Sequence, residues 1–211
     1  MEVHPPHSPI RSIKDFLLHL LAITIGLLIA LSLEASVEWM HNRRLVREAR
    51  ENIAQEIHDN QQSLTREMSA LPTEEQQLEK LLSVVNAEER GGAATPDQHL
   101  VWTVTRLNDS SWNTAFSTGA VGHMNYDEVR RYSQLYALQQ MFNSSMDRYL
   151  ESRRDMYSFL TRVNLPAKPS PTEFEDGKRA ISSEMVTGQF LREIGEALNG
   201  GYAKIQGGAP Q

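Results

Sequence analysis

The sequence contains no cysteine, which excludes disulfides, thiolate metal sites and a cysteine nucleophile. It also lacks a Walker loop, a dinucleotide-binding glycine motif, the zinc-protease motif and the serine-hydrolase elbow. Glu38 and His41 have the spacing of a di-iron ligand pair, but a di-iron bundle needs a second such pair, which this sequence lacks. We therefore predict no catalytic residue, no cofactor, no metal site and no enzymatic activity. A hydrolase with an unrecognised site is an alternative.

Basic residues are outnumbered by acidic ones. The chain of 211 residues has 21 Lys and Arg against 27 Asp and Glu, and only two residues of each sign precede Glu34. The chain after the apolar run is therefore mildly acidic, whereas a general nucleic-acid binder needs a basic face. The composition predicts no nucleic-acid partner.

One apolar run stands near the N-terminus. Residues 16–33 contain no Asp, Glu, Lys or Arg, and Glu34 follows directly. About 18 apolar residues are enough for a helix that crosses a bilayer. We predict an uncleaved transmembrane helix over residues 16–36, with the lipid bilayer as its first partner. The alternative is a signal peptide cleaved near Ala30-Leu31-Ser32, although the run is longer than the usual apolar region of such peptides.

The basic residues that flank the run bear on its orientation. Lys14 lies two residues before the run and Arg11 is close by, whereas Arg43 and Arg44 come about ten residues after it. The positive-inside rule compares the numbers of Lys and Arg on the two sides of the span, and these numbers are almost equal here. Because Lys14 lies closest to the span, the rule favours a cytoplasmic N-terminus. We expect a single-pass protein of the cell membrane whose bulk lies outside the cytoplasm, which in a bacterium is the periplasm.

Small residues recur along the span. Ala22, Gly26 and Ala30 are four apart and share one helix face, a pattern that lets two transmembrane helices approach closely. A homodimer through the span is one reading, and the ordinary abundance of Ala and Gly in spans is the other. Trp39 follows at the depth where aromatic residues anchor a helix in the membrane interface.

The rest of the chain has the apolar spacing of helices and no clear strand. Residues 37–71 continue the span as an amphipathic helix, Pro72 is expected to end it, and a second helix runs from Thr73 to Gly91. We predict an all-α fold in which one transmembrane helix continues into a long amphipathic helix, packed with others as an irregular helical bundle. The predicted boundaries are a disordered tail over 1–15, the span over 16–36, a helical domain over 37–200 and a disordered tail over 201–211.

Later helices are placed by their caps and breakers. Thr95 and Pro96 start a helix that reaches about Leu107, a short helix follows, and Asn125 caps a long helix that Pro166 closes. Residues 166–177 are predicted to be a loop because they contain three prolines and an acidic cluster. A last helix is expected over about 179–198, closed by Gly200 and Gly201.

Aromatic residues concentrate in the middle of the chain. They would form either a bundle core or the lining of a pocket for a small apolar ligand. The candidates are Trp102, Trp112, Phe116, Tyr132 and Tyr136. We expect Trp112 and Phe116 to be core residues that hold the short helix against the long one.

Two stretches resemble a known family. They are the run Ile25-Gly26-Leu27-Leu28-Ile29-Ala30-Leu31 followed by Trp39 and Arg43-Arg44, and the segment from Trp112 to Gly119 before the long helix. Together they resemble a widespread bacterial family of single-span membrane-anchored proteins of unknown function. That family usually has a polar Gln/Asn run before the Trp, and residues 32–36 differ from it. The resemblance implies an anchored helical domain and implies no reaction.

These observations predict a membrane-anchored helical interaction or accessory module without catalytic activity, whose partner is an unidentified membrane protein. The alternative is an extracytoplasmic ligand-sensing helical bundle. Because the tail before the span is too short to hold an output domain, such a sensor would signal through a partner protein.

Overall fold

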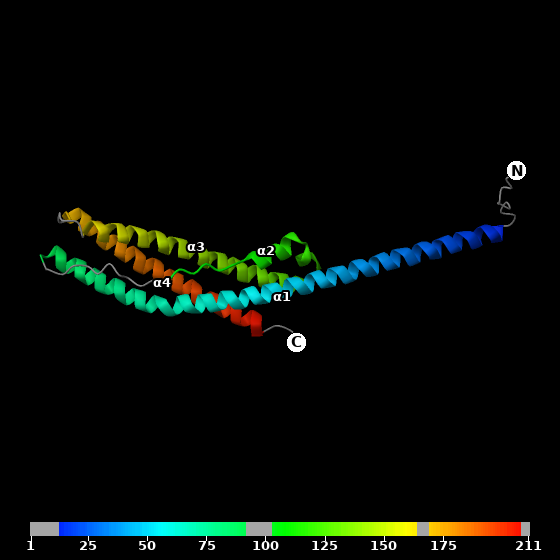
Figure 1. The fold of residues 1–211 in the computed structure, drawn as a ribbon, viewed down its shortest axis with the longest axis horizontal. Coiled ribbons are helices and arrows are strands. Elements are labelled where there is room, and N and C mark those ends of the chain that lie inside the picture. The colour runs from blue at the N-terminus through cyan, green and yellow to red at the C-terminus, as the bar shows by residue number, and fades with distance from the viewer. Residues whose placement is uncertain (1–12, 92–102, 164–168, 208–211) are drawn as a thin grey trace, which may run out of the picture. The chain divides into compact units, whose positions relative to one another are not determined.

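The computed structural model describes residues 13–91, 103–163 and 169–207. Within these ranges the chain forms four α-helices, one 3₁₀ turn and no strand, which confirms the predicted all-α class. The elements are α1 (Ile13–Glu89), α2 (Ser110–Ser117), the 3₁₀ turn η1 (Ala120–His123), α3 (Tyr126–Val163) and α4 (Pro171–Gly207) (Figure 1). The chain divides into two units, Met1–Glu48 and Ala49–Gln211.

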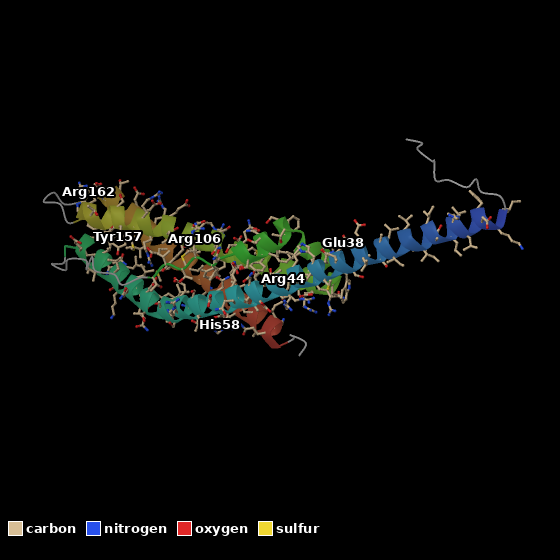
Figure 2. All side chains as sticks on the ribbon, turned by 45° about the vertical axis from the view of Figure 1, so that its right-hand side comes forward. Glu38, Arg44, His58, Arg106, Tyr157 and Arg162 are labelled. Carbon is tan, nitrogen blue, oxygen red and sulfur yellow. The ribbon has the colours of Figure 1, made fainter. Side chains whose placement is uncertain are left out.

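The first unit contains the apolar part of α1. This part is long and apolar enough to cross a membrane, and none of its most apolar stretch is buried. Its side chains radiate from every side of the ribbon (Figure 2), and Ile23 is 69% exposed. A helix that is apolar all round and has no protein packed over it suits a lipid environment. The structure therefore agrees with a membrane-anchoring helix at the N-terminal end of the described chain.

The second unit is a bundle of three long helices, formed by α1 from Ala49 onward, α3 and α4 (Figure 1). Buried positions along each helix are separated alternately by three and four residues, which is the heptad spacing of a coiled coil. On α4 the buried residues are Phe174, Gly177, Ile181, Glu184, Gly188, Leu191, Gly195, Leu198 and Tyr202. The core is therefore a continuous seam with polar and glycine positions inserted among apolar ones.

Glycines on α4 lie opposite large side chains. A Cβ atom added at Gly188 would lie 3.2 Å from the ring of Tyr149, and one added at Gly177 would collide with the ring of Phe159. Each missing side chain thus leaves room for an aromatic ring of α3. This alternation of small and large residues lets α3 and α4 pack closely while the core stays filled.

Helix α1 does not end at Pro72, contrary to the prediction. It continues through Pro72 to Glu89, and its ribbon bends in its second half (Figure 1). A proline inside a helix removes one hydrogen bond and costs about 3 kcal/mol or more. Leu71, Glu74 and Leu78 are all buried on the same seam, so packing on both sides of the proline keeps the helix continuous. The positive φ of Gly91 agrees with the predicted end of this segment.

Residues 103–109 are not helical, which corrects the predicted helix up to Leu107. The residues before Thr103 that belong to this prediction lie outside the described ranges. Thr103 and Leu107 instead use their backbone groups to bond polar side chains of α1 and α3. Residues 103–109 therefore form an irregular strap along the bundle.

Helix α4 is longer at both ends than predicted. Ser170 and Glu173 form a capping box, in which the Ser170 N–H donates to Glu173 (2.7 Å) and the Glu173 N–H donates to Ser170 Oγ (3.3 Å). The helix thus starts at Pro171, inside the predicted loop of 166–177. It also continues through Gly200 and Gly201 to Gly207, so part of the predicted C-terminal tail is helical.

The long helix α3 agrees closely with the sequence. It starts after Asn125, whose side-chain oxygen accepts the Asp127 N–H (2.9 Å). It ends at Val163, shortly before Pro166, which was predicted to close it. The short helix α2 also forms where predicted, and Gly119 with φ of 80° follows its end. A strong cap and a long apolar periodicity therefore located α3 correctly.

Candidate functional site

Polar side chains occupy several positions of the bundle core. The buried ones are Glu56, Asn60, Glu67, Glu74, Gln139, Ser145, Ser152, Arg153 and Glu184. Burial of such groups is unfavourable unless they are hydrogen-bonded or paired. Asn60, Glu67 and Glu74 are seven residues apart on α1, so each lies one heptad from the next. We call the resulting groups the Arg153 layer, the Glu67 layer, the Asn60 layer and the Glu56 layer.

The Arg153 layer joins all three long helices. Arg153 of α3 donates to Glu184 of α4 (2.6 Å) and to Glu74 of α1 (2.8 Å). The Tyr149 hydroxyl donates to the same Glu74 carboxylate (2.7 Å). Burial raises the pKa of Tyr149. Burial also raises the pKa of Glu184, and the nearby Glu74 carboxylate adds to this increase while Arg153 opposes it. The layer is therefore rich in acid relative to its single cation.

The Glu67 layer connects α1 to the strap of residues 103–109. The Thr103 hydroxyl donates to Glu67 Oε2 (3.0 Å), and the Thr103 N–H donates to Glu74 Oε1 (3.1 Å). Glu67 is 0% exposed. Burial is the main cause that raises the pKa of Glu67. Two acidic residues of α1 thus fix the start of the strap.

The Asn60 layer is a set of amide and hydroxyl groups without formal charge. Asn60 exchanges two hydrogen bonds with the backbone of Asn108, at 2.7 and 2.8 Å. Gln139 donates to the Asn108 carbonyl (2.8 Å) and accepts the Tyr202 hydroxyl (2.7 Å). One layer therefore joins α1, the strap, α3 and α4.

In the Glu56 layer, a carboxylate of α1 caps α2. Glu56 Oε2 accepts the N–H of Ser111 (2.8 Å) and the hydroxyl of Ser110 (3.0 Å). Glu56 Oε1 accepts the Tyr136 hydroxyl (2.7 Å), and burial together with this bond raises the pKa of Tyr136. A negative charge at a helix N-terminus is favourable, so Glu56 stabilises the start of α2.

The charged side chains of the four layers are buried. Glu184 and Glu67 are 0% exposed and Arg153 is 5% exposed, whereas a catalytic acid or base needs contact with its substrate. In the described ranges no three His, Asp or Glu side chains converge as metal ligands. The chemistry of these layers is therefore hydrogen bonding within the bundle, which selects one alignment of the three helices.

Of the predicted aromatic residues, three come together. The Trp112 ring stacks on Tyr136 (5.6 Å between centroids, 11° between planes) and lies 6.0 Å from Tyr132. Tyr136 is buried, while Trp112 and Tyr132 are half-buried. Phe116 is 70% exposed, so its prediction as a core residue is wrong. Trp102 lies outside the described residues.

The predicted span residues are all exposed. Ala22, Gly26 and Ala30 lie on the surface of α1, and a Cβ atom added at Gly26 would have nothing within 4 Å. The Trp39 side chain is 58% exposed, with the Arg43 guanidinium 4.5 Å from its ring centre. The stripe and the interface anchor stay predictions, since they concern a membrane and a second copy.

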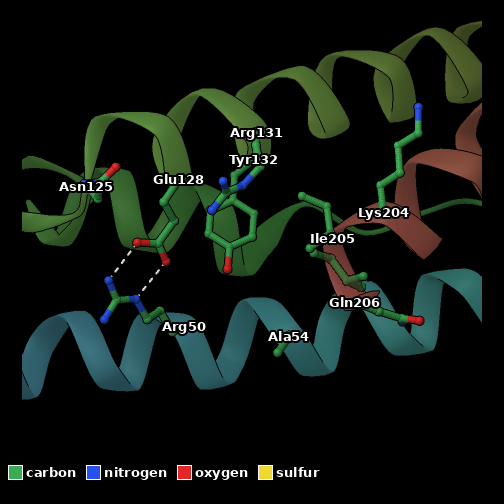
Figure 3. Close-up of a pocket in the computed structure, with 10 residues that line it drawn as sticks. Arg50, Ala54, Asn125, Glu128, Arg131, Tyr132, Lys204, Ile205 and Gln206 are labelled. Atoms are coloured by element: carbon green, nitrogen blue, oxygen red, sulfur yellow. Dashed lines mark hydrogen bonds and ion pairs between the residues drawn. The ribbon is translucent and has the colours of Figure 1, made fainter. Parts of the chain in front are cut away.

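A cavity of about 630 Å³ opens where α1, the start of α3 and the end of α4 meet (Figure 3). It is lined by Arg50, Ala54, Ile57, Asn125, Glu128, Arg131, Tyr132, Lys204, Ile205 and Gln206. Arg50 donates twice to the Glu128 carboxylate, at 2.7 Å each. Only Tyr132 was among the predicted residues. The others could not be found from sequence, because α4 was expected to end before Lys204.

No family model, no curated protein and no solved structure matches this chain. The resemblance to single-span bacterial proteins therefore stays a prediction. The functional argument depends on the geometry of the two units.

Proposed function

We propose that this protein is a membrane-anchored helical module of the bacterial cell membrane that acts by binding a membrane protein and not by catalysis. The observation that carries the proposal is the continuity of α1, which contains both the candidate span and one of the three bundle helices. A bundle whose own core helix comes from the membrane anchor is suited to holding a fixed surface beside a membrane partner.

The closed polar layers support the same proposal. Arg153, Glu74 and Glu184 are bonded to one another in the core, where they contribute to alignment and not to turnover. Buried polar groups can specify one register among several that apolar residues alone would permit. A single well-defined bundle surface is what a binding module requires.

Photo-crosslinking in the membrane tests this proposal. A photoreactive amino acid replaces Met141, Val186 or Phe190, each of which is 54–57% exposed, in the full chain. We expect one position to give an adduct of discrete mass with another membrane protein. As a control, the same residue is placed at Phe142, which is 0% exposed and should give no such adduct. Absence of an adduct at every exposed position would overturn the proposal.

For topology, we propose that the N-terminus lies in the cytoplasm and the bundle in the periplasm. Lys14 next to the span supports this orientation. Alkaline phosphatase fused after Gln211 should be active in a bacterial host, because this enzyme functions only after export. Activity restricted to a cytoplasmic reporter fused at the same position would contradict this orientation, and a mature N-terminus near Leu33 would contradict the anchor.

We also propose that two copies associate through the span. Ala22, Gly26 and Ala30 offer a surface without side-chain bulk, and the open space beside Gly26 means that Gly26→Ile does not disturb the chain itself. Cross-linking in membranes should give dimers of the wild type and fewer dimers of Gly26→Ile. Leu27→Ile is the matched control, which should cross-link as the wild type does. A monomeric wild type would overturn this part of the proposal.

The cavity favours a second candidate function, an extracytoplasmic bundle that senses a ligand and signals through a partner protein. Its volume of about 630 Å³ falls in the range of small-molecule sites. Its walls come from three different helices, so a bound ligand would contact α1, α3 and α4 together.

A further inference from the structure

The cavity combines an apolar wall with polar groups at its rim. Ala54 and Ile57 of α1 and Ile205 of α4 supply the apolar part, and Ile57 is buried (1% exposed). Figure 3 shows Arg50 and Glu128 facing each other at one side, with Ile205 and Gln206 at the opposite side. A ligand in this space would therefore meet apolar and charged groups at the same time.

The charges at this rim do not cancel. Arg50 and Glu128 neutralise each other in a bidentate pair, whose hydrogen bonds raise the pKa of Arg50. Arg131 and Lys204 remain, and neither has an acidic partner among the residues that the structure describes. The site thus carries two uncompensated positive charges in a protein that is acidic overall. Charge complementarity selects an anion.

Further donors lie next to the two cations. Tyr132 is half-buried in the wall with its hydroxyl in the cavity, and burial raises its pKa, so the phenol keeps its proton near neutral pH. Asn125 adds an amide at the start of α3. Tyrosine and arginine donors both suit a carboxylate or phosphate oxygen.

We propose that this cavity binds a small amphiphilic anion, whose carboxylate or phosphate group is attracted by the positive charges of Arg131 and Lys204 and whose apolar tail lies against Ala54, Ile57 and Ile205. The proposal rests on the ligand-sensing candidate and is independent of the protein-binding surface. Such an anion could be a free metabolite or the head of a membrane lipid, because both present the same chemistry to these residues.

Calorimetry on the full chain in phosphatidylcholine nanodiscs tests the proposal. The probes are hexanoate, hexyl phosphate, hexan-1-ol, hexylamine and inorganic phosphate. We expect the two amphiphilic anions to bind at least about tenfold more tightly than hexan-1-ol and hexylamine, and their binding should weaken with salt. Inorganic phosphate should bind more weakly than hexyl phosphate, because it lacks the tail. Equal binding of hexylamine and hexanoate would overturn the proposal.

Variants separate the charge from the fold. Arg131→Gln with Lys204→Gln should weaken hexyl phosphate binding by about tenfold or more, while the melting curve stays that of the wild type. Arg130→Gln is the matched control, because Arg130 is adjacent, pairs with Asp127 (3.1 Å) and is not in the cavity wall. Ile205→Ser should weaken hexyl phosphate without changing inorganic phosphate. Unchanged binding in the Arg131 and Lys204 double variant would overturn the site.

The source of the ligand follows from a second set of nanodiscs that contain phosphatidic acid. If the lipid head occupies the cavity, the wild type should bind hexyl phosphate more weakly in nanodiscs with phosphatidic acid than in phosphatidylcholine alone. The double variant should show no such difference between the two lipids. If the ligand is a free anion, binding should be the same in both lipids. Crosslinks at Met141, Val186 or Phe190 that persist while every anion fails to bind would refute this site and leave the binding module intact.

Discussion

The two parts of the bundle core differ in chemistry. Near the end of α3 and the start of α4 the core is an apolar cluster of Leu78, Leu81, Val85, Met156, Phe159, Leu160, Phe174 and Ile181. From Glu74 back to Glu56, polar layers interrupt the same heptad seam. The apolar cluster supplies burial, which stabilises any alignment that keeps apolar residues inside. The polar layers select one alignment of the three helices, because the hydrogen bonds of each layer form only when its particular partner residues face each other.

The largest effect is expected from removing the cation of the Arg153 layer. Arg153→Met leaves Glu74 and Glu184 buried without their partner, and breaking a buried pair in this way costs about 3–5 kcal/mol. Thermal unfolding of the full chain, followed by circular dichroism, should show a large fall in melting temperature. Adding Glu74→Gln and Glu184→Gln to Arg153→Met should recover much of the lost melting temperature, because the two amides carry no charge. If the triple variant is no more stable than Arg153→Met, unpaired charge is not the cause.

A somewhat smaller loss is expected in the apolar cluster. Leu160 is 1% exposed, and truncation of a buried leucine to alanine costs about 2–5 kcal/mol. Leu160→Ala should therefore lower the melting temperature by a similar amount at every pH, because no charge is involved. A loss that varied strongly with pH would show that this cluster is coupled to the polar layers and would break the comparison.

The aromatic stack next to the Glu56 layer should contribute less. Trp112 is half-buried and stacks on Tyr136, so Trp112→Ala should cost about 1–3 kcal/mol. Phe116→Ala, on the same short helix, should change stability by less than about 0.5 kcal/mol, because Phe116 is exposed. Thermal unfolding of the two variants measures the two stability losses. Equal losses would mean that Phe116 has a partner that one copy of the chain does not show.

The smallest effect is a dependence on pH confined to the polar layers. Burial raises the pKa of Glu67 and of Glu184, so the folded state holds these protons more tightly than the unfolded state does. Their stabilisation is complete below the unfolded pKa and is lost as pH rises through the folded pKa. The melting temperature should thus fall as the pH rises above about 4.5, the usual pKa of a glutamate.

Glutamine variants identify the groups responsible for that slope. Glu67→Gln should flatten it, because the amide has no proton to lose. Glu173→Gln is the control: Glu173 is half-buried, its hydrogen bonds to Ser170 lower its pKa, and it therefore stays ionised as the pH rises. A melting temperature that rises with pH in the wild type would show that the buried carboxyls are ionised throughout.

Much of the fold could be predicted from local signals. The cap at Asn125 and a long apolar periodicity located α3. Two predictions that were based on prolines were wrong. Pro72 was read as a stop, although buried residues on both sides hold α1 together, and Pro171 was read as part of a loop, although it is the first residue of a capped helix. The Ser170 and Glu173 pair carried that second signal in the sequence.

The polar layers could not be assigned from one helix alone. A glutamate such as Glu74 looks like a surface residue until the partner helices and their alignment are known, and its partners Tyr149 and Arg153 lie more than 70 residues away. The heptad spacing of Asn60, Glu67 and Glu74 was a usable clue, because the same spacing continues the apolar positions. Phe116 shows the reverse error, since an apolar residue on a two-turn helix need not face the core.

The spacing of these layers restricts how α1 can move. Sliding α1 by one heptad, about 10.5 Å at 1.5 Å per residue, in one direction would bring Glu67 to Arg153 and Asn60 to Thr103, two acceptable exchanges. The same slide would bring Ile53 to Gln139 and Asn108, whose polar groups would then lose their partner. A slide in the other direction would place Leu81 against Arg153. The polar layers therefore allow one register of α1 in the bundle, since a shift of one heptad in either direction leaves buried polar groups without their partners.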